Sequence, residues 1–464
     1  MLVLKYFVFF LDSTPRFFMG DSASYIHTAM TGWIPSDRSF LYGYLIRIFS
    51  GPQDGLTTFL AVQVLVSAGA AILAGLAARI AAGASMGTAT VVALVVSLEP
   101  LQLAYERYVM AETFAGLMLA ILVVSALWYL RKPALLPLLS FVGAGIGLVS
   151  LRLNTVPLVW SLAFILPVLS VARFPGTSFG PFRNPNSARF ARVALHVVLL
   201  LALTAVTHGV YRHVYGALRD GPPGYQHADG LFAVAGWAPL IRADAFPDAF
   251  LAEQILSAVA IDLSDPGNRE AQRWSPTGIS YCFEQVIGNP YDANRLAREV
   301  AFRAALNDPV AVFRLGFHTV SRYLDPGQIR ASLRWDQGEN PITENLASDL
   351  RSVFAVDVAR SVEPSPVRSW HGFPVNWYIL LPLMPCVAFL CIPFVPTCSR
   401  PEVGFLVIVG FGLVACGPFL GTMTVVRYLH PLAWLNMVLF AVIGHSLLKA
   451  RLSAQKASPV AFGL

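Results

Sequence analysis

Long apolar runs separated by short polar stretches make up most of the chain. Runs long enough to cross a bilayer, about 20 residues each, lie near 57–82, 86–105, 112–130, 134–150, 154–172, 193–213, 375–396, 403–420 and 428–448. The shorter apolar run MLVLKYFVFFL, at residues 1–11, is followed by no small-residue cleavage site and is interpreted as a retained first span. The pattern predicts an all-α polytopic membrane protein with about ten spans.

The apolar pattern is interrupted by one long polar segment, which divides the chain into three predicted parts. These are an N-terminal transmembrane module at 1–213, an extracytoplasmic cap at 214–372, and C-terminal transmembrane helices with a short basic tail at 373–464. The cap opens with the turn-rich stretch RDGPPGYQHADG and contains helix-like stretches bounded by Asp, Asn and Pro. We expect a mainly helical cap that rests on the outer membrane surface.

Composition and charge agree with this topology. The chain is 56% hydrophobic and only 13% charged, which is unlike a soluble domain. The predicted inner loops carry basic residues opposed only by Glu402, as the positive-inside rule requires: Arg79, Arg131, Lys132, Arg173, Arg183, Arg189, Arg192, Arg400, Lys449, Arg451 and Lys456. The net charge of +6 therefore reflects membrane topology and argues against nucleic-acid binding. We expect an integral protein of a bacterial inner membrane, with the cap facing the periplasm.

The first predicted outer loop, 12–56, is long for a connection between spans and is rich in aromatic and charged side chains. Asp21 follows Gly20 in RFFMGDSASYI, close to the membrane boundary and without a basic neighbour in sequence. Tyr25, Arg38 and Tyr42 follow in the same loop. Loops of this length in compact proteins are usually functional or disordered, and their aromatic content argues against disorder. Tyrosines at a membrane surface can equally be anchors.

Two more outer loops concentrate polar groups. SLEPLQLAYERYVMAETFAG, 97–116, holds Glu106, Arg107 and Glu112, and Glu112 begins an apolar span. A carboxylate there either faces a cavity or stabilises the helix N-terminus, and the two readings are compatible. TVVRYLHPLAW, 424–434, places Arg427, Tyr428 and His430 at the mouth of the last span. This arginine either snorkels to the interface or binds a phosphate.

Together these loops resemble the polytopic glycosyltransferases of the GT-C fold, the relatives of protein O-mannosyltransferases and of lipid A aminoarabinose transferase. The resemblance implies a GT-C-like bundle and a catalytic carboxylate at Asp21, although Ser22 stands where the family often has a second acid. It implies that Glu112 is the acidic residue of the second loop and that Arg427, Tyr428 and Arg107 bind the donor phosphate. The other expected substrate-binding residues are Tyr25, Arg38, Tyr42, Glu106 and His430.

The implied reaction moves a sugar from a polyprenyl-phosphate donor to a lipid, glycan or protein acceptor. A carboxylate can take the proton of the attacking hydroxyl, and an arginine can neutralise the departing phosphate. One displacement would invert the anomeric centre. We expect the cap to desolvate Asp21 and to raise the pKa of its carboxyl. No Asp-x-Asp pattern occurs in these loops, so we expect transfer without a metal or other cofactor.

Other classes of protein stay open at this stage. An O-antigen ligase or polymerase would use reactive Arg and His residues in its long outer loop, here Arg322 or His318. A polytopic transporter would show broken spans or charges at mid-bilayer. A non-catalytic scaffold with an outer cap would not need acids and arginines at the membrane boundary.

Overall fold

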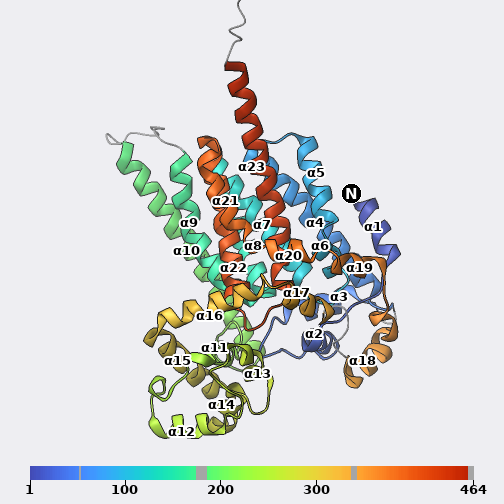
Figure 1. Cartoon of the computed structure of the whole chain (residues 1–464), viewed down its shortest axis with the longest axis vertical. Coiled ribbons are helices and arrows are strands. Elements are labelled where there is room, and N and C mark those ends of the chain that lie inside the picture. The colour runs from blue at the N-terminus through green and yellow to red at the C-terminus, as the bar shows by residue number, and fades with distance from the viewer. Residues whose placement is uncertain (52–53, 174–184, 336–341, 458–464) are drawn as a thin grey trace, which may run out of the picture.

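The computed structural model describes residues 1–51, 54–173, 185–335 and 342–457, and within these ranges the chain forms helices and loops without a β-strand. A helical bundle forms one layer, and a smaller helical cap covers one end of it (Figure 1). Six helical segments of the described chain are long and apolar enough to cross a membrane: Thr57–Ala82, Glu112–Arg131, Leu153–Ser170, Val193–Leu218, Arg400–Phe419 and Val426–Lys449. The protein is therefore an all-α integral membrane protein.

These segments correspond to α4 (Thr57–Ala82), α7 (Glu112–Arg131), α9 (Val156–Arg173), α10 (Pro185–Leu218), α22 (Arg400–Val414) with the π-turn η9 (Ala415–Phe419), and α23 (His430–Ala457) preceded by η10 (Val426–Leu429). Four predicted spans form shorter apolar helices, namely α1 (Leu2–Leu11), α5 (Met86–Ser97), α8 (Leu135–Leu151) and the segment Met384–Phe394. Two of them, α5 and Met384–Phe394, are short because the helix is interrupted inside the apolar run.

The run 86–105 is interrupted because Glu99 caps a new short helix, α6 (Pro100–Tyr105), by accepting a hydrogen bond from the Gln102 amide. The run 375–396 breaks into α20 (Val375–Leu380), α21 (Met384–Cys391) and η7 (Ile392–Phe394), with prolines at 382, 385 and 393. Proline lacks the amide hydrogen and clashes with the preceding turn. The apolar pattern therefore locates these segments but overestimates the length of their helices.

Small residues let the inner helices approach closely. A Cβ on Gly75 of α4 would come within 2.4 Å of the Ala89 carbonyl oxygen of α5, and most of the buried residues in the second half of α4 are alanines. Such contacts are typical of packed membrane helices, where association depends on close van der Waals contact. The tight bundle holds the outer ends of α7, α8 and α23 in fixed relative positions.

The predicted cap 214–372 divides into two parts. The first has its own apolar core, made by α11 (Asp229–Gly236), α12 (Ala249–Ala258), α14 (Ile279–Ile287), α15 (Pro290–Asn307) and Leu315 of α16 (Pro309–Arg322). The second part, with α17 (Pro326–Arg334) and α18 (Glu344–Phe354), contributes Tyr323, Ile329, Leu333, Leu346, Leu350 and Phe354 to the core of the bundle. Only the first part is a separate layer.

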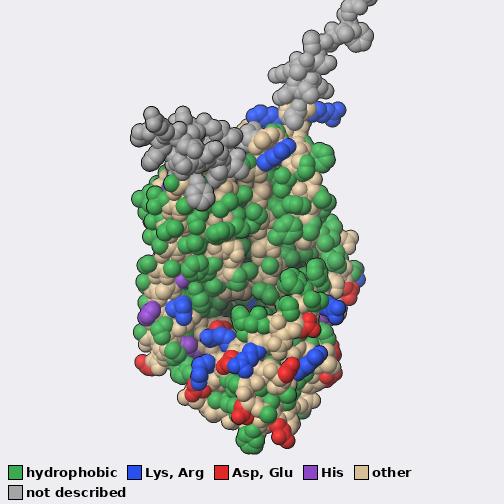
Figure 2. Space-filling view, turned by 90° about the vertical axis from the view of Figure 1, so that its left-hand side faces the viewer, with side chains coloured by type: hydrophobic (Ala, Val, Ile, Leu, Met, Phe, Trp, Pro, Cys, Tyr) green, Lys and Arg blue, Asp and Glu red, His purple; other side chains and the backbone are tan. Residues whose placement is uncertain are grey.

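The first outer loop folds into two helices, α2 (Met19–Thr31) and α3 (Leu41–Phe49), which lie at the same end of the bundle as the cap and beside it (Figure 1). They pack tightly, since a Cβ on Gly43 would lie 2.5 Å from the Thr28 side chain. On the face drawn in Figure 2, hydrophobic side chains cover a broad band of the bundle, and charged side chains gather on the cap. That distribution is the one expected of a membrane-embedded bundle with an exposed cap.

Candidate functional site

Two arginines from distant segments hold the Asp21 carboxylate in the first turn of α2. Arg38 Nη1 lies 2.5 Å from Asp21 Oδ1, and Arg427 Nη1 donates to Asp21 Oδ2. Arg38 also pairs with Asp37 at 2.6 Å. Arg427 lies in η10, with its guanidinium 4.6 Å from the centre of the Phe18 ring. The tertiary structure thus gives Asp21 the basic partners that its sequence neighbours lack.

These arginines reverse the expected direction of the Asp21 pKa. Burial alone would raise the pKa of this carboxyl, but the positive charges of Arg427 and Arg38 outweigh it and lower the pKa to about 2. The expectation that covering Asp21 would raise its pKa is therefore wrong for the chain without a ligand. The Asp21 carboxyl is desolvated, but its partners Arg38 and Arg427 lie outside the predicted cap, and their charges set the direction of the pKa.

A second ion pair lies close to the first. Glu112, in the first turn of α7, accepts a hydrogen bond from Arg152 Nη1 at 2.7 Å. Arg152 ends α8, and its guanidinium lies 5.4 Å from the centre of the Tyr428 ring, on which Arg427 also stacks at 5.3 Å. Tyr428 therefore connects the two ion pairs.

The Glu112–Arg152 pair faces a pocket with an empty volume of about 430 Å³, including its open mouth. Polar groups of Glu112, Arg152, Asn154, Tyr428 and His430 line it, together with apolar and small side chains. The other lining residues are Ala115, Gly116, Leu119, Leu148, Thr155, Leu413, Cys416, Gly417 and Pro431. Its lining, mostly apolar with a few convergent polar groups, is of the kind found in small-ligand sites, but only about 30 Å³ of the pocket admits the centre of a water molecule in the ligand-free chain.

Tyr25 and Tyr42 lie behind the ion pairs as packing residues. Their ring centres are 4.8 Å apart in an edge-to-face arrangement. The Tyr42 hydroxyl donates to Gln63 at 2.9 Å and is fully buried. Tyr25 is also buried. The ligand-free arrangement therefore shows both tyrosines supporting α2 and α3 from within the protein.

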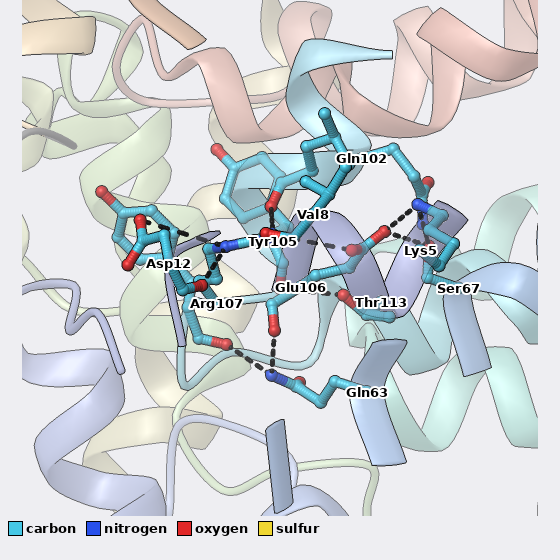
Figure 3. A network of polar contacts seen from close by, with 12 residues as sticks. Lys5, Val8, Asp12, Gln63, Ser67, Gln102, Tyr105, Glu106, Arg107 and Thr113 are labelled. Carbon is cyan, nitrogen blue, oxygen red and sulfur yellow. Dashed lines mark hydrogen bonds and ion pairs between the residues drawn. The ribbon is translucent and has the colours of Figure 1, made fainter. Parts of the chain in front are cut away.

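Glu106 and Arg107 belong to a different network, shown in Figure 3. Glu106 pairs with Lys5 and accepts a hydrogen bond from Ser67. Arg107 donates to backbone carbonyls of Asp12 at 2.8 Å, Leu103 at 2.6 Å and Val8 at 2.9 Å. Neither residue lines the pocket. This network joins α1 to the bundle and uses the donors of Arg107 for backbone contacts.

The buried network reaches the pocket through His430. Its Nε2 lies 3.0 Å from Gln102 Oε1, and Gln102 Nε2 donates to Ser67 Oγ at 2.6 Å. Ser67 is the residue that also contacts Lys5 and Glu106. The imidazole orientation at the pocket wall is therefore set by polar residues of α4 and α6.

Sequence analysis identified most of the residues that meet here but assigned no role to Asp37 and missed Arg152 and Asn154. Arg152 had a usable signal, because it is a lone arginine in a very short outer connection between two apolar runs, where the positive-inside rule disfavours it. Asn154 anchors the pocket wall by donating to the Cys416 carbonyl oxygen at 3.0 Å. No sequence signal predicts that contact, because the two residues are far apart in the chain.

Among the residues described, no group of three His, Cys, Asp or Glu side chains is placed to hold a metal ion. Comparison of the chain with protein-family models, with curated proteins and with solved structures finds no match. The functional argument therefore rests on the site itself.

Proposed function

We propose that the chain is a membrane glycosyltransferase, which moves a sugar from a polyprenyl-phosphate donor to a lipid, glycan or protein acceptor outside the membrane. The convergence of charged groups at the outer end of the bundle is the observation that carries the proposal. Asp21 and Arg38 come from the first outer loop, Glu112 from the second, Arg152 from the third and Arg427 from the last. Glu112 and Arg152 line the pocket, and Tyr428 connects them to Arg427. A chain with no ligand to bind has little reason to gather these groups.

The donor supplies an anion attached to a lipid, and the site is suited to both parts. Arg427 and Arg152 flank the same tyrosine ring and offer planar donors for a phosphate. The pocket beside Arg152 is lined by apolar side chains of the spanning helices, such as Leu119 and Leu413. A donor held with its phosphate on these arginines would keep its lipid chain in the membrane and its sugar toward the cap.

Asp21 is the proposed base, and the donor would activate it. In the ligand-free site Arg38 and Arg427 keep the carboxylate ionised, but each of its two oxygens already accepts a hydrogen bond from one of these arginines. A phosphate that draws Arg427 away removes a stabilising positive charge and adds a negative one nearby. Both changes increase the proton affinity of the carboxylate, so Asp21 becomes an effective base only when the donor is bound.

The bond changes are those of one displacement. The acceptor oxygen forms a bond to the anomeric carbon while its proton passes to Asp21. The bond between the anomeric carbon and the phosphate oxygen breaks, and its electron pair leaves on the phosphate, whose charge Arg427 and Arg152 stabilise. The anomeric configuration inverts. Glu112 would orient Arg152 through their ion pair, and this scheme requires no metal or cofactor.

Two features favour this function over the alternatives. The charges around Asp21 and the pocket gather at the outer ends of the spans, whereas a transporter would place them near the bilayer centre. The interrupted runs 86–105 and 375–396 are the feature that this chain shares with transporters. Arg322 and His318, the residues a ligase-like mechanism would use, lie on α16, outside the two ion pairs around Asp21 and Glu112, and Arg322 donates to Gln328 at 2.7 Å. The proposed location is a bacterial inner membrane, with the site facing the periplasm.

Incubation of the purified full chain with radiolabelled polyprenyl-phosphate sugars and membrane extracts tests the proposal. We expect label to move from the donor into an acceptor fraction, with inverted configuration in the product. Asp21→Asn should abolish the transfer. If the wild-type chain transfers no sugar from any donor of a broad panel, or if Asp21→Asn transfers at the wild-type rate, the proposal is wrong.

A further inference from the structure

Exposed apolar side chains cover one face of the α15–α16 hairpin. Phe302 and Leu306 of α15 and Val310, Phe313 and Phe317 of α16 are each more than half exposed, from 57% at Val310 to 72% at Leu306. The spacing of 310, 313 and 317 places the α16 residues on one side of the helix. Five exposed large apolar side chains, three of them phenylalanines, are unusual on two consecutive helices of a water-exposed domain and indicate contact with another apolar phase.

The side of α16 next to this exposed face rests on the end of a spanning helix. Gly316 is buried against Phe419, the last residue of η9, and a Cβ at this glycine would lie 2.2 Å from the ring. The rings of Phe313 and Phe317 lie 6.0 Å and 5.8 Å from that of Phe419, centre to centre. The exposed face of α16 is therefore continuous with the outer end of the apolar segment Arg400–Phe419.

Orientation and charge agree with a position at the membrane surface. In Figure 1, α16 runs across the ends of the spanning helices, at the level where the bundle meets the cap. Arg314 and His318 are exposed on the same helix, one position after each phenylalanine. A helix with large apolar side chains on one face and basic residues beside them is typical of helices that lie in the headgroup layer.

We propose that α16 is a membrane-surface anchor of the cap. The face formed by Phe302, Leu306, Val310, Phe313 and Phe317 inserts into the boundary between lipid headgroups and acyl chains of the outer leaflet, and Arg314 faces the lipid phosphates. The anchor keeps η9 at the level of the lipid surface. Two residues of η9, Cys416 and Gly417, form part of the pocket wall. This inference does not depend on the transferase function.

Hydroxyl-radical footprinting of the full chain in nanodiscs tests the anchor without any substitution. The discs contain phosphatidylcholine and phosphatidylglycerol and hold one chain each, so a second copy cannot shield the helix. Phe250 is the matched control, because it is 65% exposed, like Phe317 at 66%, and lies on α12 at the far end of the cap. We expect Phe313 and Phe317 to be oxidised about threefold more slowly than Phe250, or slower still. Equal oxidation rates would overturn the proposal.

A lipid with a photoreactive acyl chain identifies what covers the face. We expect cross-links on the peptide 309–322, as on the spanning peptide 400–419, and none on 249–258. Slow oxidation of Phe317 without lipid cross-links on α16 would mean that protein, not lipid, covers this face. That result would also refute the anchor.

Discussion

The protein contains two clusters of acids and bases made from the same residue types, and they have opposite environments. In the network of Figure 3, the Lys5 and Glu106 side chains are completely buried, and the N–H groups of Arg107 donate to backbone carbonyl oxygens. In the cluster around Asp21, the Asp21 side chain keeps 24% of its surface exposed, and the neighbouring Glu112–Arg152 pair lines a pocket. Charge at a membrane boundary therefore does not identify a site by itself. Solvent access to the charged groups separates the two clusters, whereas proximity to the pocket does not, because the buried network also reaches the pocket through His430.

Breaking the buried network should produce the largest effect, and the effect should be on stability. Glu106→Gln leaves the Lys5 ammonium without its counter-ion, and removal of one partner of a buried pair typically costs about 3–5 kcal/mol. Unfolding in a denaturing detergent, followed by circular dichroism, measures the loss. Glu299→Gln, which removes one partner of an exposed pair with Arg303, is the control and should change stability little.

The double variant Lys5→Met with Glu106→Gln sharpens this test, because it removes both charges. It should regain part of the stability lost in Glu106→Gln. If Glu106→Gln and Glu299→Gln are equally stable, the network of Figure 3 does not stabilise the packing of α1 on the bundle.

Asp21→Asn should have the largest effect on the reaction and a smaller effect on the fold. Loss of a general base typically lowers the rate about a hundredfold or more, while loss of the counter-ion of Arg38 and Arg427, whose charges lower the pKa of Asp21 to about 2, should cost about 2 kcal/mol of stability at pH 7. Transfer of sugar and the unfolding transition are measured on the same preparation. Asp37→Asn is the matched variant, since Asp37 pairs with Arg38 but has no contact with Arg427; it should retain more activity than Asp21→Asn.

Arg427→Lys should weaken donor binding by roughly tenfold although the charge is preserved, because an ammonium lacks the planar pair of donors. The measurement is the dissociation constant of a radiolabelled polyprenyl-phosphate sugar. Arg298→Lys, at an exposed cap pair with Asp229, is the control and should bind the donor normally. An unchanged dissociation constant in Arg427→Lys would leave this arginine as a snorkelling or purely structural residue.

The smallest expected effect is the change of kcat/KM with pH. Because the pKa of Asp21 is lowered to about 2, its carboxylate stays ionised as the pH falls and takes up a proton only below about pH 3. The value of kcat/KM, which reports the free enzyme, should therefore vary less than about twofold between pH 5 and 7 through this group. If kcat/KM falls below about pH 6 in the wild type and this fall is absent in Asp21→Asn, the arginines do not lower the pKa of the Asp21 carboxyl.

The lowered pKa of Asp21 also sets how the free energy of unfolding depends on pH. A carboxyl whose pKa is lower in the folded chain than in the unfolded one stabilises the fold above its unfolded pKa, and this contribution is lost as the pH falls toward about 2. Wild type and Asp21→Asn should therefore respond alike to a change from pH 7 to pH 5.

The sequence alone determined the membrane class, the approximate positions of the apolar segments and the outer loops that carry polar groups. Burial of apolar residues in lipid is a local requirement, so each segment shows it in its own composition. Helix ends were less predictable. Glu99 and the prolines at 382, 385 and 393 end helices inside apolar runs, and hydrophobicity alone does not register them.

Only the tertiary structure decided which charges face each other. In sequence, Glu106 and Glu112 look alike, yet one pairs with Lys5 in the interior and the other pairs with Arg152 at the pocket. Asp21 has no basic neighbour in sequence, yet Arg427, more than four hundred positions away, contacts it and lowers its pKa. An electrostatic environment depends on distance in space and on burial. Neither can be read from spacing along the chain.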